Sequence, residues 1–254
     1  MEGLLFLYPF VITSETKQIQ MKQILLYLSI FLISTTSFCQ ELTGVELLEN
    51  AITYHDPNGN WNTFNGTVHV TMESPGKPNR DTEIQINLPE EYFYSKAVKD
   101  SISTEFILEK EDCKILYNGS ETFSEEIAKE KRLSCERAIM YKNYYTYLYG
   151  LPMKLKDPGT IVDNKVERKS FMGKEYLVIK VTYKEPVGGD TWYFYFNPES
   201  YAMEIYQFFH EESKNDGEYI LLTKEEIIKG IKVPKNRVWY TNKEDQLLGT
   251  DILK

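Results

Sequence analysis

The stretch Thr191-Trp192-Tyr193-Phe194-Tyr195-Phe196 decides the fold class of this chain. Its Trp and Phe side chains fall on one face of an extended strand and its tyrosines on the other, because successive side chains of a strand alternate. The turn residues Asn197-Pro198-Glu199-Ser200 follow, and a second apolar segment occupies 201–210. The pattern therefore predicts a β-hairpin.

Short strands of the same kind recur on both sides of this hairpin. Turn residues such as Asn118-Gly119 separate them, and no linker or internal repeat interrupts the series. The spacing in residues 223–230 differs from that of a strand and predicts one or two short helical turns. The series indicates a single domain built on an antiparallel sheet or barrel. The remaining strands are expected at 64–72, 82–88, 91–98, 103–108, 113–117, 162–171, 175–183, 217–222, 231–240 and 247–253.

Three segments have helical rather than alternating spacing. Apolar residues share one face of 44–55. Thr43 is the expected N-cap, and Glu46 three residues later completes a capping box. Ser124 is the expected N-cap of a short second helix, and a third helix is expected at 134–149. Tyrosines are spread around this third helix, so we expect protein to enclose it on more than one side.

The N-terminal region has the form of a secretory signal. A lysine follows Met21, an apolar run comes next, and small residues stand where a signal peptidase cuts. We therefore expect a leader at 1–39, with the true start at Met21 and the signal peptide at 21–39, and a mature domain at 40–254. The apolar run is shorter than the about 20 residues of a membrane span. The alternatives are an uncleaved membrane anchor and lipidation of Cys39.

Two cysteines, Cys113 and Cys135, lie in the expected mature domain. In an oxidising compartment such a pair is expected to form a disulfide. The bridge closes a loop of about 22 residues and stabilises the fold by about 3 kcal/mol in the chain-entropy model. The alternative is two separate buried thiols. A catalytic thiol is disfavoured, because neither cysteine adjoins a histidine.

The chain is acidic, with 38 Asp and Glu against 29 Lys and Arg and a formal net charge of -9. An acidic domain repels a phosphate backbone, which argues against a nucleic-acid partner. The sequence contains no phosphate-binding loop, zinc-protease motif or hydrolase elbow, so we expect neither a cofactor nor a bound metal.

Several short motifs resemble the lipoprotein-carrier (LolA/LolB-like) fold of the Gram-negative periplasm. Besides the first helix, they are Asn65-Gly66-Thr67-Val68, Ile115-Leu116-Tyr117-Asn118-Gly119, the helix end at Leu151-Pro152 and the turn Phe196-Asn197-Pro198. The resemblance implies a mainly β (α+β) fold, an unclosed curved antiparallel barrel of about 10–12 strands. It also implies that the N-terminal and mid-chain helices pack on the concave face beside an apolar cavity for acyl chains.

Two longer motifs, 54–61 and 190–194, look like an uncharacterised family of exported bacterial proteins. This resemblance implies a periplasmic or secreted location in a Gram-negative bacterium, and it implies no activity.

The catalytic candidates are His55, Asp56 and His210. An adjacent histidine and carboxylate can move a proton or bind a metal, so a periplasmic hydrolase is one hypothesis. It requires His55 and His210 within a few Å of each other at the mouth of a pocket. The structural alternative, which we favour, has Asp56 binding the amides of the following turn and His55 closing the helix end.

The ligand candidates are aromatic and apolar residues of the third helix and the hairpin, because lipophilic molecules bind in pockets lined by such groups. They predict a non-enzymatic carrier or sensor for an apolar small molecule, a lipid or a lipoprotein acyl chain. If the same residues form a solid core, the chain is a surface-interaction module instead. The candidates are Tyr141, Tyr144, Tyr145, Leu148, Trp192, Phe194, Phe196 and Met203.

Overall fold

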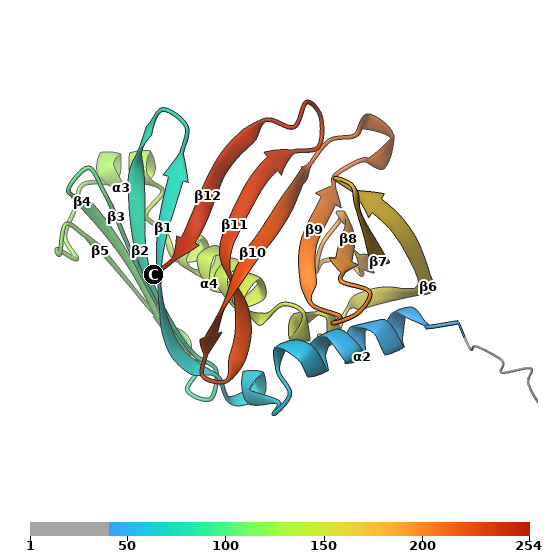
Figure 1. Cartoon of the computed structure of the whole chain (residues 1–254). Helices are drawn as coiled ribbons and strands as arrows, with labels where there is room; N and C mark the ends of the chain where they lie inside the picture. Colours follow the sequence, from blue (N-terminus) through green and yellow to red (C-terminus); the bar gives the residue numbers. More distant parts are fainter. Residues whose placement is uncertain (1–40) are drawn as a thin grey trace, which may run out of the picture. The chain divides into compact units, whose positions relative to one another are not determined.

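The computed structural model describes residues 41–254, of which Leu42–Lys254 form one compact unit (Figure 1). The predictions for the leader, including the start at Met21, the signal peptide and Cys39, lie outside the described residues. No helix within the described range is both long and apolar enough to cross a membrane.

In the described range three α-helices form at the expected positions, and α2 and α3 begin at the predicted N-caps. In α2 (Gly44–His55) the Thr43 side chain accepts from the Glu46 amide while the Glu46 carboxylate accepts from the Thr43 amide, which completes the capping box. Ser124 caps α3 (Glu125–Lys131), and Ser134 caps α4 (Cys135–Gly150). Helix α4 ends at Gly150, where a Cβ atom would overlap the ring of Trp61.

All strands within residues 41–254 belong to one twelve-stranded antiparallel sheet in the order β5-β4-β3-β2-β1-β12-β11-β10-β9-β8-β7-β6. Every neighbouring pair is consecutive in sequence except β1 and β12, which join the two ends of the described chain. The strands are β1 Asn65–Ser74, β2 Lys77–Asn87, β3 Tyr92–Lys99, β4 Ile102–Glu109, β5 Asp112–Tyr117, β6 Thr160–Phe171, β7 Lys174–Tyr183, β8 Thr191–Phe196, β9 Met203–Phe209, β10 Glu218–Ile228, β11 Ile231–Thr241 and β12 Leu247–Leu253.

The sheet is strongly curved but does not close, because β5 and β6 at its two edges do not pair. Helix α4 lies behind the central strands in Figure 1, inside the curve. Helix α2 packs on the β6 and β11 side, whereas α4 contacts β3, β4 and β5. The predicted unclosed barrel with helices on its concave face is therefore confirmed.

One local prediction is wrong: residues 223–230 do not form helical turns. They continue β10 to Ile228, which pairs with Ile231 of β11. Lys229 and Gly230 between them both have positive φ, 51° and 83°, as a two-residue hairpin turn requires. This tight turn brings Ile228 opposite Ile231, so the segment up to Ile228 belongs to strand β10.

The hydrophobic core has two main clusters on the concave face. One packs α4 on the first strands, where the Tyr145 ring stacks on Phe93 at a centroid distance of 6.3 Å. The other packs α2 and the end of α4 on the later strands and contains Phe194 and Phe196. Tyr195 belongs to a third, smaller cluster on the opposite face of the sheet. The predicted division of this strand into two faces is therefore correct.

The predicted disulfide between Cys113 and Cys135 is present, with a Cα–Cα distance of 6.0 Å. Cys113 lies on the edge strand β5, and Cys135 is the first residue of α4. The bridge therefore holds the start of α4 against the edge of the sheet.

Candidate functional site

A cavity of about 1170 Å³ lies between α4 and the central strands of the sheet. Helix α4 lines it along most of its length, from Arg137 to Leu148, and residues of β1, β2 and β6 to β12 form the facing wall. Aromatic rings contribute much of its walls, including those of Tyr144, Tyr147, Tyr183, Trp192, Phe208 and Trp239, and charged side chains such as Arg137, Lys142, Asp157 and Glu218 also line it.

Five of the eight ligand candidates line this cavity: Tyr141, Tyr144, Tyr145, Leu148 and Trp192. The tyrosines come from the inward side of α4, and Trp192 comes from the facing strand β8. Tyr144 keeps 39% of its surface exposed, so an apolar ring there is available to a ligand.

The other three candidates, Phe194, Phe196 and Met203, do not line the cavity. They are at most 5% exposed and belong to the solid cluster under α2. Phe194 and Phe196 share the face of Trp192, but successive inward residues of β8 lie progressively deeper in the core. Alternation identified their face correctly, whereas it carries no information about which end of a strand borders a cavity.

The Trp192 side of the cavity is an ordered aromatic wall. The Trp192 ring lies 4.8 Å from the ring of Phe208 and 5.9 Å from that of Tyr147. The Tyr147 hydroxyl in turn lies 2.5 Å from the Tyr183 hydroxyl. Because each of these side chains is held by a neighbour, the wall is formed before any ligand enters.

The floor of the cavity contains buried polar groups. Asp251 Oδ2 accepts a hydrogen bond of 3.1 Å from the Trp239 indole, while Oδ1 has no partner among the described residues. Burial raises the pKa of the Asp251 carboxyl, and nearby Arg237 opposes this shift. The buried Tyr206 hydroxyl also has no partner within residues 41–254. A ligand or water with a polar group can bind here, because unsatisfied buried groups favour such a partner.

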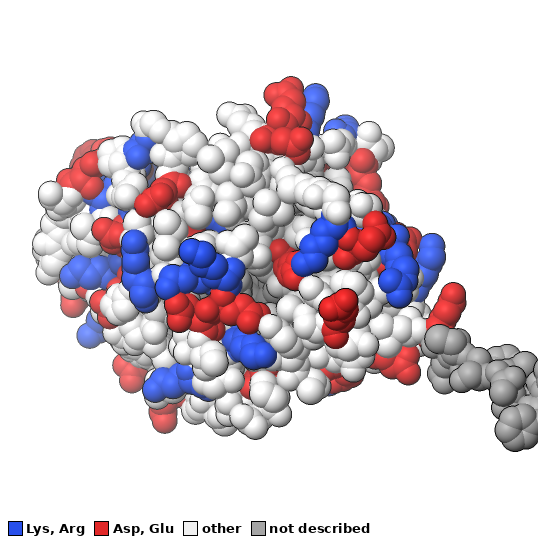
Figure 2. Space-filling model, in the orientation of Figure 1, with Lys and Arg blue, Asp and Glu red and all other residues white. Residues whose placement is uncertain are grey.

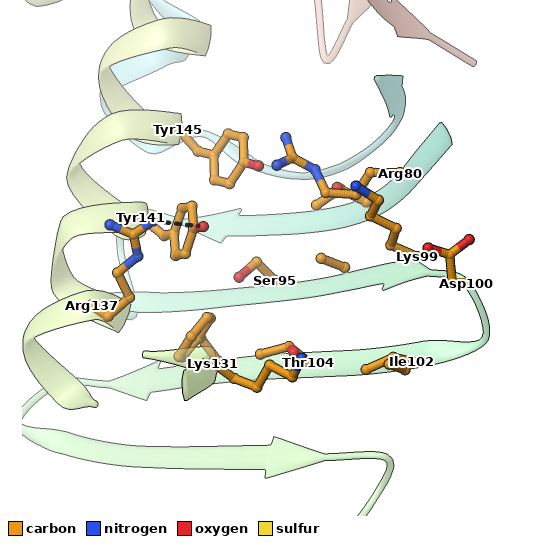
Figure 3. Close-up of a pocket in the computed structure, with 13 residues that line it drawn as sticks. Arg80, Ser95, Lys99, Asp100, Ile102, Thr104, Lys131, Arg137, Tyr141 and Tyr145 are labelled. Carbon is orange, nitrogen blue, oxygen red and sulfur yellow. Dashed lines mark hydrogen bonds between the residues drawn. The ribbon is translucent and has the colours of Figure 1, made fainter. Parts of the chain in front are cut away.

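A smaller pocket of about 320 Å³ adjoins the large cavity (Figure 3). Arg80, Arg137, Tyr141 and Tyr145 line both spaces. The concave faces of β2, β3 and β4 form its floor, and α4 forms its wall.

His55 and Asp56 have structural roles. His55 Nδ1–H donates to the Lys232 carbonyl at 2.8 Å, and Nε2 accepts from the Met203 amide at 2.9 Å. Both carboxylate oxygens of Asp56 accept from amides of the following turn, those of Asn60 and Trp61, at 2.8 Å. Asp56 therefore binds the turn amides as expected, whereas His55 bonds to β9 and β11 and not to the end of α2.

The hydrolase hypothesis requires His55 beside His210, and the structure separates them. His55 binds Met203 at the start of β9, whereas His210 follows the end of this strand. Seven residues of extended chain span roughly 20 Å. His210 is exposed and bonds to Asp190 at 2.7 Å, which raises the pKa of its imidazole. Within the described range, no group of three His, Cys, Asp or Glu side chains is placed to hold a metal ion.

Sequence reasoning missed several residues that line the two spaces. Tyr206, Trp239 and Asp251 come from three separate strands, β9, β11 and β12. In each strand the alternation of apolar and polar residues places these side chains on the inward face. Their meeting depends on the register of β11 against β12 and on the position of α4, which no local pattern encodes.

The fold and the cavity define the class of protein: an unclosed antiparallel β-sheet whose concave face holds a helix and a ligand-sized cavity. This is the architecture that the resemblance to lipoprotein carriers implied. The chain belongs to the family of unknown function DUF6503, whose model matches residues 21–253. The expected membership of an uncharacterised family is therefore confirmed. None of the curated proteins compared with the chain matches it.

Solved structures similar to this chain include a LolA superfamily protein from Nitrosomonas europaea, which is 10% identical with a TM-score of 0.46 and covers 84% of this chain and 91% of its own. A structure described as an outer membrane lipoprotein-sorting protein domain from Vibrio parahaemolyticus is 8% identical with a TM-score of 0.47, over 83% and 91%. A DUF1329 family protein from Desulfovibrio piger is 8% identical with a TM-score of 0.44, over 83% and 90%. At these identities the likeness concerns the fold alone.

Proposed function

We propose that this protein is an exported, non-enzymatic carrier or sensor that holds a lipid or a lipoprotein acyl chain between α4 and the curved sheet. The observation that carries the proposal is the cavity of about 1170 Å³ with its aromatic walls. Sites for small organic molecules usually occupy about 300–1,000 Å³, so this space is ample for a long apolar ligand.

Burial of an acyl chain supplies the driving force. Each methylene group transferred from water to an apolar wall stabilises the complex by about 0.8 kcal/mol. Rings such as that of Tyr144 are exposed in the cavity, and a bound acyl chain covers them. The preformed wall around Trp192 reduces the entropy that binding costs.

An exported location also agrees with the disulfide between Cys113 and Cys135, because such bonds persist in oxidising compartments. The open cavity supports a binding protein over the alternative of a surface-interaction module with a solid core. The hydrolase alternative requires His55 and His210 close together, and the structure separates these two residues.

Two neighbouring residues of β8 provide a matched test. Trp192 lines the cavity, and Tyr193 lies on the opposite face of the sheet. We expect Trp192→Ala to weaken binding of a fluorescent long-chain lipid probe by about 10- to 100-fold, because it removes about 1.5–3 kcal/mol of apolar contact. Tyr193→Ala should bind the probe as the wild type does. Equal probe affinity in Trp192→Ala and the wild type, measured by fluorescence titration of delipidated protein, would contradict the proposal.

A further inference from the structure

We infer that the smaller pocket binds the anionic head group of an amphipathic ligand whose apolar part occupies the large cavity. This inference rests on the proposed function and specifies the chemical class of the ligand, a carboxylate or phosphate amphiphile. Four cationic side chains line the pocket, Arg80, Lys99, Lys131 and Arg137, against one carboxylate, that of Asp100 (Figure 3).

Two of these cations lie at facing positions of adjacent strands, just beyond the last paired residues. Asp81 of β2 pairs with Val98 of β3, and Arg80 and Lys99 are the next residue of each strand beyond this pair. Both side chains line the pocket and therefore lie on the same face of the sheet. Like charges directly opposite each other destabilise a sheet. An anion bound between them would convert this repulsion into attraction.

Within the part of the chain that the structure describes, the cations of this pocket are poorly neutralised. Arg80 Nη2 donates only to the Met72 sulfur, and Arg137 donates to the Met140 sulfur and the Tyr141 hydroxyl. No carboxylate within residues 41–254 forms an ion pair with Arg80, Lys99 or Arg137. Lys131 alone has such a partner, Glu130 at 2.8 Å.

This lack of partners is unexpected for an acidic chain. Acidic residues outnumber basic ones by 38 to 29, and Figure 2 shows acidic and basic side chains interleaved over the visible face. Lysines elsewhere in the described range, such as Lys96 and Lys180, do reach carboxylates. The pocket therefore gathers positive charge against the balance of the molecule, and a focused field of this kind attracts anions.

The floor of the pocket is suited to an oxyanion. Hydroxyl groups of Thr82, Ser95 and Thr104 line it, and these small side chains leave the space open. Hydroxyls donate hydrogen bonds to carboxylate or phosphate oxygens, and the planar guanidinium of arginine matches both groups.

The two spaces lie next to each other along α4 and share lining residues. Arg80, Arg137, Tyr141 and Tyr145 line both of them, so one molecule can place its head group among the cations and its chain along the aromatic wall. The disulfide at the start of α4 holds the helix against β5 and thereby fixes the wall that carries Arg137.

The test compares a long-chain fatty acid with the fatty alcohol of the same chain length on delipidated full-length mature protein. Both probes bury the same chain, and only the acid carries a charge. At low salt we expect the wild type to bind the acid about tenfold more tightly than the alcohol, because hydrogen bonds to the charged head group stabilise the complex. In the double variant Arg80→Gln/Arg137→Gln this ratio should fall towards one. Arg168→Gln, an exposed arginine on β6 that lines neither space, is the matched control and should keep the wild-type ratio.

A wild type that binds acid and alcohol equally tightly would overturn the head-group inference and leave the proposed lipid carrier intact. If neither probe binds, the proposed function fails as well. Calorimetry with inorganic phosphate then shows whether the smaller pocket binds a free anion. Phosphate binding in that case would mean that the pocket is a site for free anions and not for lipid head groups. If the double variant does not fold, Lys99→Gln at the exposed rim and the salt dependence of the wild-type ratio provide the same test. A ratio that does not change between low and high salt contradicts the inference.

Discussion

Replacing His55 with alanine is expected to lower the free energy of unfolding by about 3 kcal/mol, because it leaves two backbone groups without partners. The imidazole accepts from the Met203 amide and donates to the Lys232 carbonyl, and it thereby joins α2 to β9 and β11. The side chain is only 2% exposed, so water does not readily replace it. The measurement is urea unfolding followed by tyrosine and tryptophan fluorescence.

The same substitution is expected to change the pH dependence of stability. Burial lowers the pKa of the His55 imidazole below 6.5, against the opposing effect of its bond to Lys232. Below pH 6.5 the unfolded chain therefore binds a proton that the folded chain resists. His55 stabilises the fold fully above pH 6.5, and this contribution falls as the pH falls towards the pKa of the folded state. The stability difference between wild type and His55→Ala should accordingly be larger at pH 7.5 than at pH 5.

His69 provides the matched control, because it is exposed on β1. His69→Ala should change the free energy of unfolding by no more than about 0.5 kcal/mol. A His55→Ala protein as stable as this control would contradict the structural role of His55. The imidazole would then be free for another use.

Substitution of Thr146 by tryptophan is expected to have the largest effect on ligand binding. Thr146 lies on α4 and lines the large cavity, so an indole ring there occupies space that the acyl chain needs. We expect affinity for the fluorescent lipid probe to fall by about a hundredfold, as when several buried methylene groups lose their site. Fluorescence titration of delipidated protein measures the change, and circular dichroism checks that the sheet is intact.

Thr53→Trp is the control for this variant. Thr53 is an exposed helical threonine on α2, and it lines none of the spaces described between the sheet and α4. It should bind the probe with the affinity of the wild type. A Thr146→Trp protein that folds and still binds the probe with unchanged affinity would show that the ligand does not occupy the cavity beside α4.

The local structure of this protein could be predicted from its sequence to a large extent. Alternation identified the two faces of Thr191–Phe196, and capping residues such as Thr43 and Ser124 located the helix starts. These signals are local, since they depend on residues within a few positions of each other. The helical turns expected at residues 223–230 do not form. The spacing of this charged segment is helical, but the tight turn that follows it pairs it with β11 in a hairpin.

The candidate site could be predicted only in part. Helix α4 and Trp192 were found from their aromatic content, but the arrangement of Arg80 opposite Lys99 follows from strand register. Register and the position of a helix over a sheet are set by contacts between residues far apart in sequence. Phe194 and Phe196 show the same limit, because neither their type nor their face distinguishes cavity wall from solid core.

Native mass spectrometry of the mature protein, purified from a bacterial envelope without detergent, tests the central claim most directly. We expect a population that is heavier than the polypeptide by the mass of one lipid-sized molecule. Organic extraction should remove this mass, and thin-layer chromatography should identify the extracted molecule as a lipid. A bare polypeptide mass from every expression host, together with no binding of added lipid, would contradict the account.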